Sequence, residues 1–397
     1  MTLRHDAGHK NDLIPPEIET TPRVGSRITE QFVEARVAAG GQVFPLKGGP
    51  VKPFPPHIRE AAIEALDGKD LRPSRGLLDL RTAIASLLRQ ECGVSIDPES
   101  NILITNGAMH GLSVVFRTLL EPGDQVLIPA PTFFFDGLVR LARAEPIYVA
   151  CSESDNWKWD LERLSQAIGP KTKIIIACNP NNPTGYLPSH QDLQGLVNLA
   201  QKHNLVIVAD ECYKRMIYED FSFSSFGSFL SHENIVLVQS MSKSYAMPNW
   251  RIGFVVASDA MIYACLKIFE WDCLHCNYVG QKVAAAAIRG PQDWLNRVAK
   301  EYEVQRDIVY AAIQRTELLS CIAPKAGPFH FINTSRLNSN SDEVAEALLA
   351  EAGIPTVPGE FFQAPGYLRL PFGGDVEVIQ QMSEALVRWD SERAKGC

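Results

Sequence analysis

The stretch LVIVADE, residues 205–211, decides the fold because an unbroken apolar run leads directly into two carboxylates. Continuous apolar runs, unlike alternating ones, are typical of strands that are buried on both faces of a sheet. KIIIA at 173–177 and IVLV at 235–238 have the same character, and a helix-like segment at 189–203 lies between the first two runs. This succession predicts an α/β fold with a mostly parallel sheet and helices on both of its faces.

Each of these runs ends in polar residues. Asn179 follows the first run, Asp210 and Glu211 follow the second, and Ser240 follows the third. In open α/β sheets, ligands bind beyond the carboxyl ends of the strands. We therefore expect the three strand ends to line one crevice.

Another strand is expected at 125–128, and a helical pattern before it runs from Gly107 to Leu119. A helix start that contains glycine presents free backbone N–H groups and a positive dipole end, which suits an anion such as phosphate. A capped turn explains the same residues, so this segment does not identify a ligand by itself.

The two ends of the chain differ from its middle. The first 45 residues are rich in Pro, Gly and charge, which is typical of an arm with a short helix. Towards the C-terminus, long amphipathic helices alternate with short strands, which indicates a smaller α+β unit. Its elements are expected at 294–315, 329–333, 341–352 and 367–370. We predict a large domain over 46–290 and a small domain made of 1–45 and 291–397.

The 397-residue chain has a formal net charge of −8, and its charged residues are scattered without blocks. Neither a nucleic-acid partner nor a membrane is therefore expected. No stretch approaches the roughly 20 apolar residues of a membrane span, and the polar N-terminus lacks the apolar run of a signal peptide. A cytoplasmic enzyme is the expectation.

Nine cysteines at irregular spacing fit reduced thiols better than a disulfide framework. Cys273 and Cys276 flank His275, but no second Cys/His pair lies at the spacing of a zinc finger. No metal site is therefore expected.

Three motifs follow the three apolar runs in order. They are NPNNPTG at 179–185, DECY at 210–213, and SMSK at 240–243 with WRIG at 250–253 behind it. Together they resemble the class I and II aminotransferases, which are pyridoxal phosphate enzymes of fold type I. The resemblance covers nearly the whole chain. It implies a seven-stranded sheet between helices, pyridoxal 5'-phosphate as the cofactor, and a homodimer with shared active sites.

Matches to the family motifs imply the catalytic roles. Lys243 is expected to form the Schiff base with the cofactor and then to shuttle the Cα proton, and a surface lysine is the plain alternative. Asp210 is expected to pair with the pyridine nitrogen rather than merely to cap a helix. Asn182 and Tyr213 are expected to donate to the phenolic oxygen of the ring.

The same resemblance implies a set of residues around the cofactor phosphate and ring: Gly107, Ala108, Met109, Phe133, Ser240, Ser242 and Arg251. Met109 stands where a polar phosphate ligand is common. Phe133 is expected to stack on the ring, unless it only packs in the core. Arg369 matches the arginine that binds the substrate carboxylate, and Gly48 matches the glycine that approaches it. Asn182 is expected to border the substrate as well.

Some positions depart from the family pattern. Leu71 replaces a tyrosine that reaches the partner's phosphate, and Val51 and Lys52 replace an acidic and aromatic pair. The PSRG segment at 73–76, which lacks that tyrosine, and VPGEFF at 357–362 before Arg369 look similar to the capreomycidine synthase and enduracididine-type cyclases. Those relatives remove the Cα proton of a hydroxylated arginine, eliminate the hydroxyl and close a guanidine ring.

A guanidinium substrate requires a carboxylate beside its side chain. Glu17, Glu19 and Asp272 are candidates, and solvated or structurally paired carboxylates are the alternative for each. The leading prediction is an aminotransferase, with a cyclase or lyase of the same fold as the alternative. A pyridoxal phosphate sensor and a nicotinamide enzyme are disfavoured, because the sequence has neither a helix-turn-helix pattern nor a Gly-x-Gly-x-x-Gly after a strand.

Overall fold

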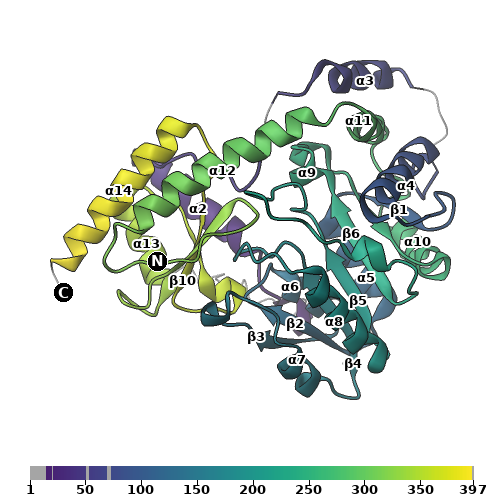
Figure 1. Cartoon of the computed structure of the whole chain (residues 1–397), viewed down its shortest axis with the longest axis horizontal. Helices are drawn as coiled ribbons and strands as arrows, with labels where there is room; N and C mark the ends of the chain where they lie inside the picture. The colour runs from purple at the N-terminus through teal and green to yellow at the C-terminus, as the bar shows by residue number, and fades with distance from the viewer. Residues whose placement is uncertain (1–14, 20, 51–52, 69–72, 396–397) are drawn as a thin grey trace.

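The computed structural model describes residues 15–19, 21–50, 53–68 and 73–395. Its centre is a seven-stranded sheet with the order β1-β7-β6-β5-β4-β2-β3 (Figure 1). The strands are β1 (Ile102–Thr105), β2 (Gln125–Ala130), β3 (Glu145–Ala150), β4 (Thr172–Cys178), β5 (Val206–Asp210), β6 (Ile235–Ser240) and β7 (Gly253–Val256). β7 is antiparallel to β1 and β6, whereas the neighbouring pairs from β6 to β3 are parallel. The predicted mostly parallel sheet is confirmed.

Helices cover both faces of this sheet (Figure 1). They are α4 (Leu78–Cys92), α5 (Ala108–Leu119), α6 (Phe135–Leu141), α7 (Leu161–Ala167), α8 (His190–Lys202), α10 (Asp259–Cys273) and α11 (Tyr278–Arg289), while α3 (Pro56–Leu66) packs on α11 (Figure 1). α8 starts where the sequence predicts because Ser189 and Asp192 form a capping box, in which each side chain accepts the backbone N–H of the other. None of the described helices has the length and apolarity that crossing a membrane requires.

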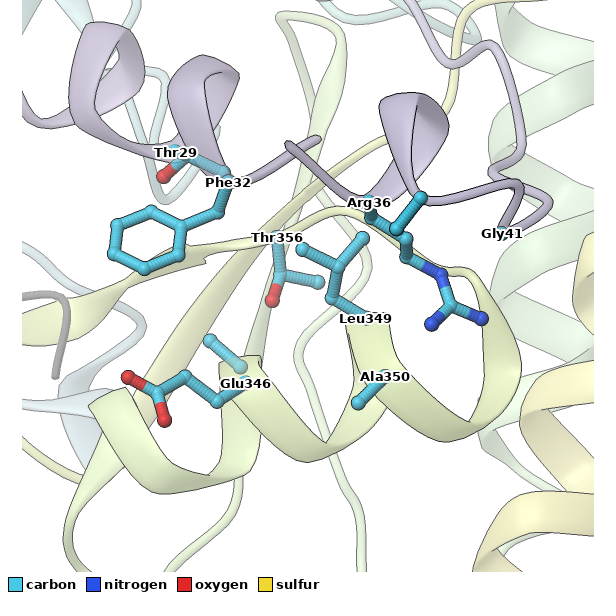
Figure 2. A pocket seen from close by; sticks show the side chains of 10 residues that line it. Thr29, Phe32, Arg36, Gly41, Glu346, Leu349, Ala350 and Thr356 are labelled. Carbon is cyan, nitrogen blue, oxygen red and sulfur yellow. The ribbon is translucent and has the colours of Figure 1, made fainter. Parts of the chain in front are cut away.

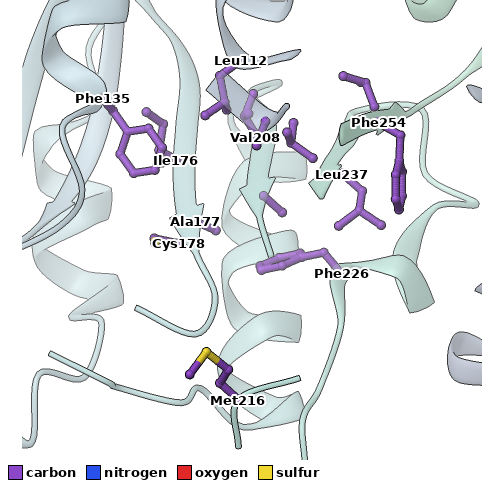
Figure 3. Packing of buried hydrophobic residues seen from close by; sticks show 14 of the residues in the cluster. Leu112, Phe135, Ile176, Ala177, Cys178, Val208, Met216, Phe226, Leu237 and Phe254 are labelled. Carbon is purple, nitrogen blue, oxygen red and sulfur yellow. The ribbon is translucent and has the colours of Figure 1, made fainter. Parts of the chain in front are cut away.

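The core lies between the sheet and its helices. Ile176 of β4, Val208 of β5 and Leu237 of β6 are at most 1% exposed and belong to one apolar cluster with Leu112 of α5 (Figure 3). Burial of each such side chain contributes about 1.5–3 kcal/mol, which explains why apolar runs become the central strands. The packing holds the carboxyl ends of β4, β5 and β6 at one edge of the sheet.

The second sheet has three strands in the order β8-β10-β9, all paired antiparallel. Its strands and helices are β8 (Phe329–Asn333), β9 (Val357–Pro358), β10 (Tyr367–Pro371), α12 (Asp293–Ile313), α13 (Ser341–Ala347), the π-helical η4 (Leu348–Ala352) and α14 (Val376–Ala394). The domain limits at 46 and 290 remain a prediction.

Two helices form the described part of the N-terminal arm, α1 (Pro16–Glu19) and α2 (Gly25–Ala38). α2 lies beside the small sheet (Figure 1). Its first residue must be small, because a Cβ on Gly25 would lie 2.5 Å from the ring of Phe361. That contact fixes the start of α2 against the part of the chain that carries β9 and β10.

Candidate active site

The carboxyl ends of β4, β5 and β6 open into one cavity of about 480 Å³, called the inner cavity below. Cys178, Asp210, Ser240 and Lys243 all line it. The strand ends that were expected to share a crevice therefore do so. An outer cavity of about 550 Å³ also contains Lys243 and extends towards α2 and β10.

Lys243 lies in α9 (Met241–Ser244), the short helix directly after β6. Its Nζ donates to the Gly48 carbonyl at 2.9 Å. A Cβ on Gly49 would lie 2.7 Å from the same Nζ, so this close approach needs a glycine. Burial, and then the charge of Arg369, lower the pKa of Lys243 to about 8. The amine therefore loses its proton far more readily than a surface lysine does.

Asp210, the last residue of β5, presents its carboxylate to the inner cavity. The residue is 7% exposed, and its Oδ1 accepts the Cys212 N–H at 3.0 Å. Burial raises the pKa of this carboxyl group, and no charged residue of the described chain offsets the effect. A cationic group inside the cavity would supply the missing partner.

α5 begins at the edge of the inner cavity, where Ala108 and Met109 line the wall. Their N–H groups precede the first bond of the helix, which Gly111 donates to the Gly107 carbonyl at 3.2 Å. The expected role of Gly107 needs a correction: its own N–H donates to the Thr105 carbonyl at 2.8 Å. This bond closes the turn after β1, so the N–H donors available to an anion start at Ala108.

Gly107 is nevertheless essential to the shape of this corner. Its φ is +81°, and an added Cβ would collide with the guanidinium of Arg251. Gly253 of β7 has the same function from the other side, because its Cβ would lie 2.7 Å from the Ala108 nitrogen. These two glycines let a helix start and a guanidinium approach the same point.

Ser240, Ser242 and Arg251 complete the corner. The Ser240 hydroxyl accepts the Ser242 N–H at 3.0 Å, which caps α9. Nη1 of Arg251 lies 3.4 Å from the Ser242 hydroxyl, and the same nitrogen donates to the Pro248 carbonyl at 3.0 Å. Hydroxyls, a guanidinium and a helix start thus converge, which is the chemistry that binds a phosphate group.

Phe133, Asn182 and Tyr213 line both cavities. Phe133 packs on Phe134, with ring centroids 5.0 Å apart, and still presents one side to the cavities. The Asn182 Oδ1 accepts from Nη1 of Arg369 at 3.1 Å, which leaves its amide N–H groups as donors. Burial raises the pKa of Tyr213, so its hydroxyl stays a neutral donor.

The NPNNPTG loop holds Asn182 in place through its neighbours. Asn181 donates from Nδ2 to the Pro131 carbonyl at 3.2 Å, and its Oδ1 accepts from the Thr184 hydroxyl at 2.8 Å. Gly185 has a φ of +68°, in the left-handed region that favours glycine. The loop is therefore rigid, and both its polar and its glycine positions are needed for its shape.

Arg369 of β10 lies in an aromatic cage. Its Cζ is 4.3 Å from the ring centre of Phe329, 4.9 Å from that of Phe362 and 5.6 Å from that of Phe134. Burial lowers the pKa of Arg369 to about 10, and its Nε is buried without a hydrogen-bond partner among the described residues. The cage orients a guanidinium that still has donors for a carboxylate.

α2 supplies the outer wall, a feature that the sequence reasoning missed. Arg27 lines both cavities, and Glu30, its ion-pair partner, lines only the outer one. Arg27 is also among the positive charges that lower the pKa of Lys243. The i, i+3 spacing of the two residues was visible in the sequence, but nothing there indicated which way the helix faces.

A third hollow of about 390 Å³ lies between α2 and the segment formed by α13 and η4 (Figure 2). Phe32 of α2 and Leu349 of η4 lie on opposite sides of it. Thr29 and Thr356 line both this hollow and the outer cavity. Its lining includes neither Lys243 nor Arg369, so the hollow adjoins the site without belonging to it.

Pyridoxal 5'-phosphate fits the residues of the inner cavity. The buried carboxylate of Asp210 lacks a cationic partner, which a protonated pyridine nitrogen provides. The corner around Arg251 suits the phosphate group, and a lysine of lowered pKa stands on the same wall as Asp210. Arg369 lines the outer cavity, and its guanidinium is the group to which a substrate carboxylate would bind.

The carboxylates suggested for a guanidinium substrate do not come together here. Asp272 of α10 accepts two hydrogen bonds from Arg117, at 2.7 and 2.8 Å, and lies 3.5 Å from Nε2 of His110. Asp272 is thus structurally paired, and neither it nor Glu19 lines the two cavities. Four positions singled out in the sequence lie outside the described residues or side chains: Glu17, Val51, Lys52 and Leu71.

The Cys273–Cys276 segment has a structural contact in place of a ligand. The Cys276 thiol donates to the Ile104 carbonyl at 3.5 Å. In the part of the chain that the structure describes, no three His, Cys, Asp or Glu side chains gather as a metal ion would require.

Comparison with known proteins gives a consistent result. A family model described as "Aminotransferase class I and II" matches residues 46–386. The chain is 31% identical over 386 residues to an aspartate aminotransferase of Geobacillus stearothermophilus, covering 94% of this chain and 98% of that protein. It is 29% identical over 350 residues to an aromatic-amino-acid aminotransferase of Thermococcus litoralis, covering 85% and 89% of the two chains.

Solved structures agree with the sequence relatives. The aspartate aminotransferase from Thermus thermophilus with maleate superposes with a TM-score of 0.89 at 27% identity, covering 95% of this chain and 99% of that one. An aromatic aminotransferase from Pyrococcus horikoshii superposes with a TM-score of 0.85 at 29% identity, covering 91% and 99%.

Proposed function

The chain belongs to the class I and II aminotransferases, and from that premise we propose that it transfers the amino group of a dicarboxylic amino acid to a 2-oxo acid. The family, the fold and the pyridoxal phosphate-dependent aminotransferase activity predicted from the sequence are confirmed by the family match and the named relatives. The residue roles, the substrate and the assembly below are our proposals.

One observation carries the assignment of residues. Lys243 is shared by two cavities, with the carboxylate of Asp210 on the wall of one and the caged guanidinium of Arg369 on the wall of the other. An amine of lowered pKa, a buried acid and a carboxylate-binding arginine are the groups that amino transfer requires.

Lys243 performs two tasks in this proposal. When bound, the cofactor supplies an aldehyde that condenses with amines and a ring that accepts the electrons of the broken Cα–H bond. A pKa of about 8 makes the Lys243 amine a nucleophile near neutral pH. Once released, the same amine would be a base for the proton at Cα and would deliver that proton to the cofactor carbon that carried the aldehyde, as amino transfer requires.

Asp210 and Arg369 hold the two ends of the reacting assembly. The Asp210 carboxylate stabilises a proton on the ring nitrogen, because two opposite charges in a buried site favour the charged state of both. Arg369 binds the α-carboxylate of the substrate, and its bond to Asn182 sets the plane of the guanidinium. Held at both ends, the Cα–H bond faces the amine that removes its proton.

Arg27 recognises the side chain of the substrate. Its guanidinium lies at the junction of the two cavities, and Glu30, its partner, lies further out. An acidic substrate side chain would replace Glu30 as the partner of Arg27. Aspartate aminotransferases among the relatives agree with this choice. The named relatives are aminotransferases and do not favour the ring-closing alternative. Asp272, one of the carboxylates considered for it, is paired with Arg117.

A panel of substrates tests the proposal. The cofactor-loaded protein is incubated with aspartate, glutamate, neutral, aromatic and basic amino acids, each with and without 2-oxoglutarate. We expect transfer that requires an oxo acid and is fastest with the acidic amino acids. Loss of water from a hydroxylated amino acid without an acceptor would contradict amino transfer, and equal rates across the panel would contradict the acidic preference alone.

We also propose that the chain acts as a homodimer with shared active sites. Large apolar side chains are exposed on α10 and α3: Trp271 is 92% exposed, Leu66 is 72% exposed and Leu274 is 67% exposed. Exposed apolar residues of this size are typical of protein interfaces. Sedimentation of the native protein tests this, and a monomer with full activity would refute it.

A cytoplasmic location is proposed on the state of the thiols. Every cysteine of the described chain is free, which suits a reducing compartment. Fractionation of cells that express the native gene tests the location, and activity outside the cytoplasm would contradict it.

A further inference from the structure

Glu211, the residue after Asp210, is a second buried carboxylate to which the chemistry above assigns no task. It is completely buried and lines neither cavity. Its backbone N–H donates to the Val238 carbonyl at 2.9 Å, so it continues the pairing of β5 with β6. Successive residues of an extended chain point to opposite faces, which is why Asp210 faces the inner cavity and Glu211 faces away from it.

The same alternation occurs at all three strand ends. Cys178 and Ser240 line the inner cavity, whereas their neighbours Asn179 and Gln239 do not and are at most 2% exposed. Behind the catalytic face, Asn179, Glu211 and Gln239 thus form a second layer. We call these three residues the rear cluster.

Glu211 is the acceptor for the whole rear cluster. Its Oε1 accepts from the Phe226 N–H at 2.7 Å and from Nδ2 of Asn179 at 3.3 Å. Its Oε2 accepts from the Ser225 hydroxyl at 2.7 Å and from Nε2 of Gln239 at 3.1 Å. Four donors from three other segments of the chain therefore meet one carboxylate group.

The amides have no alternative arrangement around this carboxylate. The oxygens of Asn179 and Gln239 are both buried without a hydrogen-bond partner among the described residues. Leaving an amide oxygen unsatisfied costs free energy. The amide N–H groups meet acceptors instead: Nδ2 of Asn179 donates to Glu211 and also to the Ser224 carbonyl at 2.8 Å, and Nε2 of Gln239 donates to Glu211. Such a constellation sets the relative positions of β4, β5 and β6 more tightly than backbone pairing does alone.

We propose that Glu211 is a positioning residue of the active site. Glu211 follows Asp210 directly and binds the side chains of Asn179 and Gln239. Asn179 lies three residues before Asn182 in the chain, and Gln239 lies four residues before Lys243. Through these bonds Glu211 fixes the carboxylate, the amide and the amine that face the cofactor. The inference rests on the proposed function, because it concerns the placement of groups that act on the cofactor.

Two substitutions separate positioning from simple packing. Glu211→Ala removes the shared acceptor of four donors, although Nδ2 of Asn179 keeps its bond to the Ser224 carbonyl. Glu211→Gln keeps the size and shape of the side chain. Its new amide N–H can donate to the unpartnered Oε1 of Gln239 once the Gln239 amide rotates by half a turn. We expect Glu211→Ala to lower kcat by about 10- to 100-fold with little change in KM, because misplacing reacting groups by about 1 Å costs roughly that much. Glu211→Gln should recover most of the loss.

The control is a buried carboxylate away from the cavities. Asp390 of α14 is completely buried and accepts the N–H groups of Glu317 and Leu318 at 2.7 and 3.1 Å. Asp390→Ala should lower the unfolding temperature as Glu211→Ala does. Only Glu211→Ala should change the circular dichroism of the bound cofactor, which reports ring orientation, and weaken cofactor affinity in an equilibrium titration.

The proposal is overturned if Glu211→Ala keeps the native cofactor dichroism, affinity and kcat while losing only thermal stability, as the Asp390 control does. If Glu211→Ala does not fold, Gln239→Leu serves instead, and native dichroism and kcat in that variant overturn the proposal equally. If the native protein shows the absorption band of the Lys243-bound cofactor but transfers no amino group, the proposed reaction is wrong. The role of Glu211 can still be tested in that case, because cofactor dichroism and cofactor affinity do not depend on turnover.

Discussion

The two walls of the active site are built in opposite ways. The inner wall consists of the ends of central strands, where Asp210 and Ser240 are nearly buried and each side chain has defined partners. The outer wall consists of α2, where the side chain of Arg27 is 68% exposed and, among the described residues, pairs with Glu30 on the same helix. The groups to which we assign the chemistry lie on the buried wall, and the group to which we assign substrate choice lies on the exposed one.

The largest effect is expected from the centre of the inner wall. Lys243→Ala removes both the nucleophile and the base at Cα, so amino transfer should fall by at least about 10⁴-fold. The absorption band of the lysine-bound cofactor should also disappear. Lys300→Ala changes a lysine whose side chain is 70% exposed and should have no effect on either measurement. If the Lys243→Ala variant kept its activity, the assignment of the catalytic groups to the inner wall would be wrong.

The next effect concerns the charge of Asp210. Asp210→Asn keeps the size of the side chain but no longer stabilises a proton on the ring nitrogen, and kcat should fall by about 10²- to 10³-fold. Asp210→Glu keeps the charge but displaces it, so its kcat should lie between that of the native enzyme and that of Asp210→Asn. Steady-state rates at saturating substrate measure this, and an Asn variant as fast as the native enzyme would contradict the pairing.

The buried Lys243 of the inner wall should also lower the free energy of unfolding of the cofactor-free protein. Burial lowers the pKa of Lys243 from 10.5 to about 8. Below pH 8 the folded cofactor-free protein must hold a buried ammonium, which costs up to about 3 kcal/mol relative to the unfolded chain. Between pH 8 and 10.5 the folded state loses its proton first, so the cost shrinks as pH rises. Lys243→Met should therefore raise the free energy of unfolding at pH 7.

Denaturant unfolding of the cofactor-free protein at two pH values measures that effect. The advantage of the Met variant over the native chain should be about 2–3 kcal/mol at pH 7 and below about 1 kcal/mol at pH 10. An advantage that does not change with pH would indicate better packing of the methionine rather than relief of a buried charge.

The smallest effect is expected on the outer wall. Arg27→Gln should raise KM for acidic amino acids by about tenfold, because an exposed cation contributes less than a buried one. KM for neutral amino acids and kcat should stay within about twofold. Arg23→Gln is a matched control, since Arg23 is exposed, donates to Gln31 and lines neither cavity. Equal changes for acidic and neutral substrates would show that Arg27 does not read the side chain.

The strands at 173–177, 205–209 and 235–238 were predictable because buried parallel strands need continuous apolar runs, which are visible in one dimension. The motifs after those strands revealed the family and the cofactor for the same reason. Gly107 shows where such matching reaches its limit, because its N–H is used within the turn after β1. A motif match transfers a position and does not say which atoms of the residue are free.

By itself, the sequence determined the central strands, the polar residues at their ends and the lysine among them, because these depend on local periodicity and short motifs. The tertiary structure decided which side chains face one another. It put Glu211 behind Asp210, Phe329 and Phe362 around Arg369, and Arg27 at the junction of the two cavities. These contacts join segments far apart in the chain, and their direction depends on packing between a sheet, a second sheet and a helix of the N-terminal arm.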